Sequence, residues 1–126
     1  MYQDLLIRIK NAQASRKEVV QAPFSEMDFA IAKILVRTGF IRSVDKRLQM
    51  RKPVLELQLA YRGTRGAISG FKVLSVPSRR LYAGYRDLKT VRQGYGITLL
   101  STPKGVLTSS ESRQQKMGGE RLFEIW

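Results

Sequence analysis

The sequence contains neither cysteine nor histidine. These absences exclude disulfides, Cys/His zinc sites, thiolate nucleophiles and imidazole acid–base catalysis. Because most common catalytic designs are excluded with them, we expect a protein that is not an enzyme and that uses no cofactor and no metal. No stretch approaches the roughly 20 apolar residues of a membrane span, and the first residues lack the apolar run of a signal peptide. We therefore expect a cytosolic protein with no membrane partner.

Acidic residues are also scarce. Ten Asp and Glu accompany 23 Lys and Arg, which leaves a formal net charge of +13 on 126 residues. Both halves carry the excess, because residues 1–63 hold 12 basic and 6 acidic side chains and residues 64–126 hold 11 and 4. A basic tail on a neutral domain would have given strong asymmetry. The positive charge is therefore expected over the whole folded surface, which favours a polyanionic partner such as a nucleic acid.

Two helices are predicted in the first half. Apolar residues recur at helical spacing over residues 1–15, which indicates an amphipathic helix. Its apolar positions are Leu5, Leu6, Ile9 and Ala12. A second helix is predicted from Ser25, an N-cap candidate, and Asp28 in its first turn suits the positive end of the helix dipole. Gly39 is expected to end this helix.

The remainder of the first half is predicted to be extended. Val19 and Val20 form a short extended segment that Pro23 should end, because proline lacks the amide that a ladder needs. Residues 40–44 and 54–59 form two more strands, the second with alternating polarity. Residues 45–53 are expected to be a hairpin loop between them, with the cations Lys46, Arg47, Arg51 and Lys52. This half is thus predicted as helix, strand, helix, strand, strand.

The second half is predicted to be mainly β. Its strands are expected at residues 71–76, 82–85, 97–100 and 122–126, the first ended by Pro77. Thr108 and Glu111 have the spacing of a capping box and should begin a short helix that Gly118-Gly119 closes. Gly63, Gly66 and Gly70 mark a seam between two lobes. The predicted fold class is α+β, with an N-terminal α/β lobe at 1–63 and a mainly β C-terminal lobe at 64–126.

The polar segment that begins at Ser101 has two interpretations. Residues 101–108 can be an ordinary turn between a strand and a helix, in which Lys104 is solvated and Gly105 supplies a positive φ. The segment can also be a tip suited to ribose hydroxyls, phosphates and base edges of RNA, placed directly before a helix N-terminus that favours phosphate. The local chemistry permits both.

Two enzymatic motifs match only in part. Ser101 and Lys104 have the Ser-x-x-Lys spacing of penicillin-binding proteins and β-lactamases. That chemistry needs a serine that opens a helix, together with Ser-Asp-Asn and Lys-Thr-Gly partners, and neither tripeptide occurs here. Gly94-Tyr95-Gly96 resembles the start of a dinucleotide fingerprint, but its third glycine position holds Leu99.

Guanidinium groups and aromatic rings alternate further upstream. The residues are Arg79, Arg80, Tyr82, Tyr85 and Arg86. This combination can hold phosphates while it stacks on exposed bases, and the alternative is a solvated basic hairpin. Arg8, Lys10 and Asn11 of the first helix allow the same two interpretations.

Residues 96–108, followed by Gly118-Gly119-Glu120, resemble the small-subunit ribosomal protein eight of bacteria. The similarity extends over nearly the whole chain. Residues 4–12 and 30–35 look like that family's first two helices, residues 81–88 look like its central hairpin, and the ending in Trp126 is similar too. The resemblance implies an α/β lobe joined to a mainly β lobe in a primary binder of the central domain of 16S rRNA, needed for subunit assembly.

The resemblance also implies roles for individual residues and partners. The family's Ser-Thr-Ser-Lys-Gly loop enters an RNA minor groove, and Glu120 and Tyr82 match residues near that loop. With the basic positions above, the predicted RNA-binding residues are Ser101, Thr102, Pro103, Lys104, Gly105, Glu120, Tyr82, Arg79, Arg80, Arg86, Arg8, Lys10, Asn11 and Lys33. Implied partners are neighbouring small-subunit proteins, among them protein five, and the messenger RNA of its own operon, which members of the family can repress.

The chain departs from the family's pattern at several positions. Pro103 replaces the second serine of the loop, which removes a hydroxyl and a backbone donor. Val76 and Ser78 replace a basic residue and a glycine on either side of Pro77, and Ile7 stands where the family usually has threonine. At least one RNA contact is therefore expected to be missing or replaced.

Overall fold

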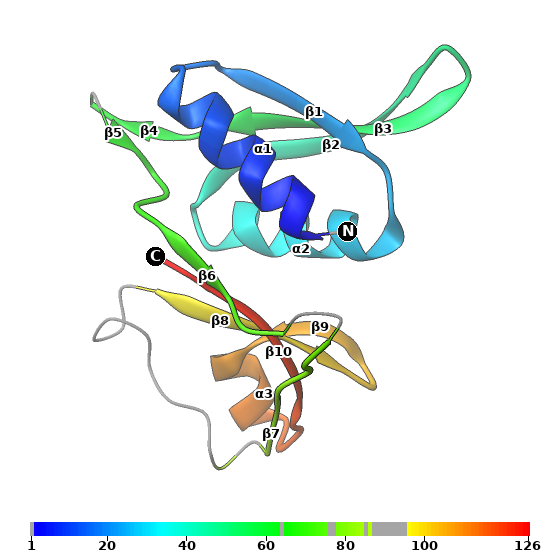
Figure 1. Cartoon of the computed structure of the whole chain (residues 1–126), viewed down its shortest axis with the longest axis vertical. Helices are drawn as coiled ribbons and strands as arrows, with labels where there is room; N and C mark the ends of the chain where they lie inside the picture. The colour runs from blue at the N-terminus through cyan, green and yellow to red at the C-terminus, as the bar shows by residue number, and fades with distance from the viewer. Residues whose placement is uncertain (1, 64, 76–77, 85, 87–95) are drawn as a thin grey trace. The chain divides into compact units, whose positions relative to one another are not determined.

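The computed structural model describes residues 2–63, 65–75, 78–84, 86 and 96–126 (Figure 1). The chain divides into two compact units, Met1–Ile68 and Ser69–Trp126, called here the N-terminal and the C-terminal unit. The predicted α+β class is confirmed, because the first unit combines helices with a sheet and the second is mostly sheet with one short helix. No described helix combines the length and the apolar character needed to cross a membrane.

The N-terminal unit has the predicted order of helix, strand, helix, strand, strand. Its elements are α1 Tyr2–Ala14, β1 Val19–Pro23, α2 Glu26–Arg37, β2 Ile41–Gln49 and β3 Lys52–Leu59, followed by the short pair β4 Tyr61–Arg62 and β5 Arg65–Gly66. The sheet has the order β1-β3-β2 and is antiparallel. Apolar residues of α1, α2 and β3 form the core, including Leu5, Ile9, Ile31, Leu35, Leu55 and Leu57. The helical spacing of α1 and the alternation in β3 thus predicted the buried positions correctly.

Both ends of α2 have the predicted chemical cause. The Oγ of Ser25 accepts a hydrogen bond from the backbone N–H of Asp28 at 3.0 Å, and Gly39 after the helix has a φ of +89°. Asp28 itself is buried, and burial raises the pKa of its carboxyl above its ordinary value against the lowering effect of Ser25. The first turn therefore holds one carboxylate that is less solvated than the sequence suggested.

The hairpin loop predicted over residues 45–53 is wrong in its extent. The strands β2 and β3 continue through this segment with the register Asp45↔Glu56 to Gln49↔Lys52, and only Met50 and Arg51 form the turn. Both turn residues have positive φ, 51° and 65°. Every residue from Asp45 to Pro53 is exposed, so the segment has no buried face that would give it an alternating pattern.

The C-terminal unit is an antiparallel sheet with one short helix. Its elements are β6 Phe71–Val73, β7 Tyr82–Ala83, β8 Ile97–Thr102, β9 Gly105–Thr108, α3 Ser109–Gln114 and β10 Gly119–Ile125. The strand order is β6-β10-β8-β9, and β7 pairs with β10 as well. The side chains of Leu99, Leu100, Leu122, Phe123 and Ile125 form the core of this unit. The terminal strand β10 therefore pairs with β6, β7 and β8.

Several boundaries in this unit differ from the predictions. The strand expected to reach Val76 ends at Val73, and Val76 and Pro77 lie outside the described residues. The strand expected over 82–85 spans Tyr82–Ala83, with Tyr85 outside the described residues. The capping box at Thr108 is present, but α3 ends at Gln114 and the positive φ that follows belongs to Lys116. Gly118 and Gly119 therefore do not close the helix.

Candidate nucleic-acid interface

The polar segment from Ser101 to Gly105 is the end of a β-hairpin. Strands β8 and β9 pair up to Thr102↔Gly105, so Pro103 and Lys104 form the tip. The expectation that this tip lies directly before a helix is wrong, because β9 separates it from α3. The free amides of that helix therefore do not belong to the tip.

Thr102 holds the hairpin tip together. Its Oγ1 donates to the backbone oxygen of Gly105 at 2.7 Å and accepts from the backbone N–H of Lys104 at 3.2 Å. The side chain of Thr102 is buried, whereas Pro103, Lys104 and Gly105 are exposed. Gly105 has a φ of +104°, which any other residue would adopt only with strain. The tip is therefore a preorganised turn that presents Lys104 and an open backbone to solvent.

Three predicted site residues lie in one row across the sheet. In β10, Glu120 pairs with Ser101 of β8 on one side and with Tyr82 of β7 on the other. Directly paired residues of antiparallel strands project from the same face, with Cβ atoms about 5 Å apart. Tyr82 is 67% exposed, and Ser101 and Glu120 are partly exposed. An aromatic ring, a carboxylate and a hydroxyl thus stand side by side next to the tip.

The two glycines before Glu120 make this row possible. A Cβ on Gly118 would lie 2.4 Å from the backbone oxygen of Ala83, and a Cβ on Gly119 would lie 2.1 Å from the backbone oxygen of Ser101. Both distances are far below van der Waals contact, and both obstacles are backbone atoms. The glycine pair therefore lets β7 and β8 approach the start of β10 from its two sides. The glycine pair is visible in the sequence, where it predicts a helix stop, but its role in the fold is this close approach of strands.

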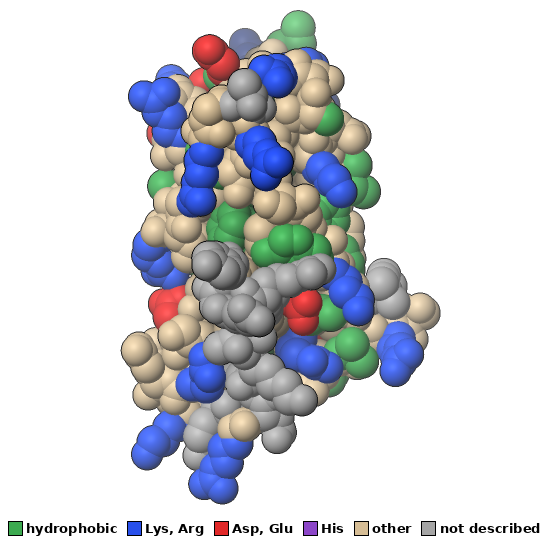
Figure 2. Space-filling view, turned by 90° about the vertical axis from the view of Figure 1, so that its left-hand side faces the viewer, with side chains coloured by type: hydrophobic (Ala, Val, Ile, Leu, Met, Phe, Trp, Pro, Cys, Tyr) green, Lys and Arg blue, Asp and Glu red, His purple; other side chains and the backbone are tan. Residues whose placement is uncertain are grey.

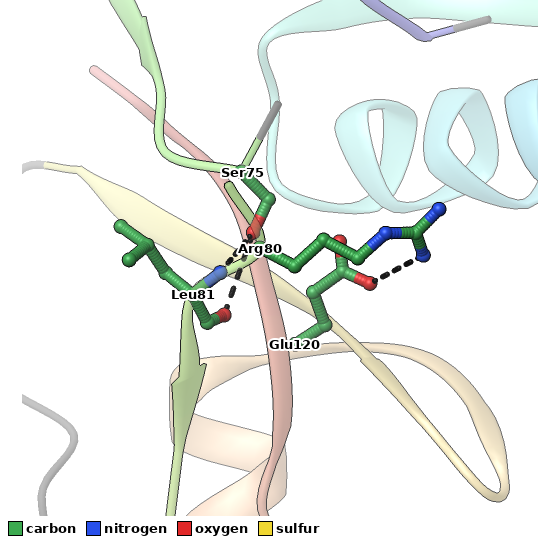
Figure 3. A network of polar contacts seen from close by, with 4 residues as sticks. All are labelled: Ser75, Arg80, Leu81 and Glu120. Carbon is green, nitrogen blue, oxygen red and sulfur yellow. Dashed lines mark hydrogen bonds and ion pairs between the residues drawn. The ribbon is translucent and has the colours of Figure 1, made fainter. Parts of the chain in front are cut away.

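Arg80 adds a cation to the row. Its Nη1 lies 3.4 Å from Oε1 of Glu120, whose side chain is only 16% exposed (Figure 3). The negative charge of Glu120 alone would repel a polyanion, and the guanidinium of Arg80 offsets that negative charge. The remaining oxygen of Glu120 can still accept a hydrogen bond from a base amine or a 2′-hydroxyl.

Ser75 positions the segment that carries Arg80, and sequence reasoning missed it. Its buried Oγ accepts from the backbone N–H of Leu81 at 2.9 Å and donates to the backbone oxygen of Leu81 at 3.4 Å (Figure 3). The backbone N–H of Arg121 in β10 donates to the same Leu81 oxygen at 2.7 Å. A lone serine in a strand-like run gives no sequence signal for such a role.

The other predicted residues are more scattered. Arg79 and Arg86 of the C-terminal unit are exposed, and Tyr85 lies outside the described residues. In the N-terminal unit, Lys10 and Asn11 are exposed on α1, and Arg8 Nε donates to Asp4 Oδ2 at 2.8 Å. The exposed Lys33 of α2 places its Nζ 4.2 Å from the ring centroid of Phe29. Figure 2 shows Lys and Arg side chains spread over the visible face of the molecule.

The enzymatic alternative lacks the geometry that it needs. Ser101 lies within β8 and pairs with Glu120, so it does not open a helix as the Ser-x-x-Lys chemistry requires. Gly94 and Tyr95 of the dinucleotide-like motif fall outside the described residues. Within the part of the chain that the structure describes, no three acidic side chains gather where they could hold a metal ion.

Fold and surface together define a small basic α+β protein whose exposed side chains suit a polyanion. The family described as Ribosomal protein S8 matches residues 1–126. Among curated proteins, the small ribosomal subunit protein uS8 of Zymomonas mobilis is 42% identical, and that of Erythrobacter litoralis is 40% identical; each match covers 98% of this chain and 94% of the relative. The protein of the same name from Persephonella marina is 41% identical over 98% of this chain and 95% of its own. The chain belongs to the ribosomal protein S8 family, as the resemblance predicted.

Proposed function

We propose that this protein is a structural component of the small ribosomal subunit that binds the central domain of 16S rRNA and supports subunit assembly. The observation that carries the proposal is the row of Tyr82, Glu120 and Ser101 beside the exposed tip at Lys104. A ring, a hydroxyl and a carboxylate on one face of the sheet, with cations beside them, are the groups that bind 2′-hydroxyls, exposed bases and phosphates. In this role the protein resides on the cytoplasmic ribosome and performs no catalysis.

Within this surface the residues have different tasks. Lys104 at the tip and Arg80 beside Glu120 neutralise phosphates, as do the exposed Arg79 and Arg86 of the same unit, and this charge gives most of the affinity. Ser101 and Glu120 exchange hydrogen bonds with sugar and base edges, and Tyr82 stacks on a base. Thr102 acts through the turn that it holds, because its hydroxyl is already bonded to Gly105 and Lys104. Pro103 cannot offer the hydrogen bond of a serine hydroxyl. The rigid tip compensates for that loss, because less conformational entropy is lost when it binds.

In the N-terminal unit, the proposal assigns phosphate contacts to Arg8, Lys10, Asn11 and Lys33. All four are exposed on α1 and α2. The three long basic side chains can reach a nearby RNA backbone, and the amide of Asn11 can donate a hydrogen bond to a phosphate oxygen. The proposal also covers the other partners that the family implies. Protein five and other small-subunit proteins would be its neighbours, and the messenger RNA of the protein's own operon would be a second RNA that binds the same row. An excess of 16S rRNA fragment should then displace that messenger.

The test is a titration of a 16S central-domain RNA fragment with the full chain at several salt concentrations. Lys104→Ala should weaken binding and lower the slope of log K against log salt by about 1, because one fewer counterion is released. Ser101→Ala should cost about 1 kcal/mol through a lost hydrogen bond, with the slope unchanged.

Arg113→Ala is the matched control, since Arg113 is an exposed cation of the same unit at the far end of α3. It should bind with nearly the affinity of the unaltered protein. Unchanged affinity and slope in both Lys104→Ala and Ser101→Ala would overturn the assignment of the tip and the row.

A further inference from the structure

The outer part of the β2–β3 hairpin, residues 46–53, is a basic feature outside the proposed site. We call it the distal hairpin. Past the pair Pro23↔Val54, β3 pairs with β2 alone among the described residues, so residues 48–53 continue beyond the three-stranded sheet as a two-stranded ribbon (Figure 1). All residues of the distal hairpin are exposed. Nothing in the core of the N-terminal unit therefore requires its length.

The charge of the distal hairpin is of one sign. Its eight residues include Lys46, Arg47, Arg51 and Lys52, and no acidic residue. Asp45 at its base lies 3.8 Å from Arg47, with both side chains more than half exposed, so this ion pair offsets little of the charge. Arg51 and Lys52 lie on the two-stranded ribbon, and Lys46 and Arg47 lie at its base, where Lys46 Nζ is 4.3 Å from the ring centroid of Phe24. Together these four exposed cations form a concentrated positive potential that complements a polyanion.

The hairpin also exposes apolar side chains near its turn. Leu48 is 76% exposed and Met50 is 93% exposed. Single exposed apolar residues are common, but these two lie within one short ribbon among the cations. Flexible apolar side chains of this kind fit against sugar edges and splayed bases in a groove, while the neighbouring cations bind the phosphates on either side.

The turn of the hairpin is strained. Type I′ geometry with positive φ at both central positions favours Asn-Gly or Gly-Gly, yet Met50 and Arg51 occupy these positions. An isolated two-stranded hairpin is marginally stable in water even with a favourable turn. Non-glycine residues persist at such positions where another constraint compensates, and a bound ligand is one such constraint.

A groove at the base of the hairpin points to the same ligand. It encloses about 320 Å³, and its lining includes Arg8 of α1, Gln21 of β1 and Gln49 and Lys52 of the hairpin. Arg8 Nη1 also donates to the backbone oxygen of Gln21 at 3.4 Å, which holds the guanidinium at this wall. Asp4 partly neutralises Arg8, so Lys52 is the stronger cation of the groove. The lining thus combines two cations with two side-chain amides, which are groups that can bind a phosphate.

We propose that the distal hairpin is a second RNA-binding element, which lays its cations along the phosphates of an RNA helix and its apolar tip against the adjoining groove. The inference rests on the proposed function for the class of ligand, and it concerns a surface of the N-terminal unit that, apart from Arg8, the proposed function does not use. An acidic protein partner is less suited to it, because a protein interface favours a larger apolar centre with few lysines.

The decisive variant is the full chain with Arg47→Ala and Lys52→Ala, titrated with the same 16S central-domain fragment. Both side chains are exposed and outside the core, so the fold should remain, as a thermal melt will show. The slope of log K against log salt should fall by about 2, one for each lost phosphate contact. The control is Arg62→Ala with Arg65→Ala, which removes the same charge from exposed positions of the β4–β5 pair and should change binding much less.

A second variant tests the apolar tip without changing the charge. Leu48→Gln with Met50→Asn keeps the net charge, and Asn tolerates the positive φ at position 50. Binding should weaken about tenfold at every salt concentration with the slope unchanged, because apolar burial is lost. Backbone cleavage of the RNA by hydroxyl radicals should show one protected segment lost in both variants and the segment protected by the Lys104 tip retained.

The outcomes separate this inference from the proposed function. Unaltered affinity and slope in the Arg47/Lys52 variant, together with weaker binding by Lys104→Ala, would overturn the hairpin and leave the function standing. Unaltered binding by all variants, Lys104→Ala included, would overturn both. Normal binding to RNA with reduced retention in assembled subunits would assign the hairpin to a protein neighbour and would equally reject the inference.

Discussion

At the scale of single residues, Gly119 shows how closely the site depends on backbone contact. Because Gly119 has no side chain, the backbone of Ser101 in β8 can lie very close to it. A Cβ added to Gly119 would be only 2.1 Å from the backbone oxygen of Ser101. Gly119→Ala should therefore separate β8 from β10 beside Glu120 and cost about 1–3 kcal/mol, as overpacking does. Thermal unfolding measures this loss, and the RNA titration should show weaker binding because the row is disturbed.

Gly63→Ala is the control for this substitution. Gly63 has a positive φ of 63°, but within the described part of the chain no heavy atom beyond its two sequence neighbours lies within 4 Å of the added Cβ. It should cost only about 1 kcal/mol of backbone strain and leave RNA binding unchanged. If Gly119→Ala proved no more destabilising than Gly63→Ala, close strand approach would not be the reason for the glycine.

Residues whose role is local were predictable, and those whose role depends on distant partners were not. Ser25 and Thr108 cap helices through contacts three residues away, so the sequence spacing suffices to find them. Ser75 bonds to the backbone of Leu81 beside β10, and Gly119 is required by a strand that lies 18 residues earlier. Such roles arise from tertiary contacts, and a local sequence pattern carries no information about them.

At the scale of elements, the short helix α3 gives a direct test of capping. Thr108 Oγ1 accepts from the backbone N–H of Glu111 at 3.2 Å, and Glu111 Oε1 accepts from the backbone N–H of Thr108 at 3.1 Å. Thr108→Ala should destabilise the C-terminal unit by about 0.5–2 kcal/mol, because it leaves the N–H of Glu111 without its cap. Thermal or urea unfolding measures the change. The exposed Ser110 in the same helical turn is the control, and Ser110→Ala should have almost no effect; equal losses would mean that the cap contributes nothing.

The two hairpins explain why element boundaries were harder to predict than elements. In β2–β3 the outer residues have no buried face, and in β8–β9 the strands continue into polar residues that were interpreted as a turn. Backbone pairing holds both extensions, and it is independent of side-chain polarity. Hydrophobic periodicity therefore locates a strand where it covers the core and misses the part that projects into solvent. These projecting parts carry the candidate RNA contacts, since function here is placed outside the core.

At the scale of the whole molecule, the fold class and the family were predictable because they depend on the sum of many positions. The class followed from the order of helical and alternating patterns, and family membership from motifs such as residues 96–108 that run along the chain. The partner class followed from the net charge of +13, which no single residue determines. The individual RNA contacts stay predictions, because each depends on where one side chain meets a ligand.

The same net charge predicts opposite responses of stability and binding to salt. Like charges on the free protein repel one another in the compact state, and salt shortens the range of this repulsion from about 30 Å at 0.01 M to about 10 Å at 0.1 M. The Tm of the free protein should therefore rise by a few degrees over this range of sodium chloride, while its affinity for RNA falls. The Arg47→Ala and Lys52→Ala double variant carries two fewer positive charges, so its Tm should depend less on salt. A Tm that is constant or falls with added salt would show that local ion pairs such as Asp4–Arg8, and not the excess of positive charge, dominate the electrostatics of the folded chain.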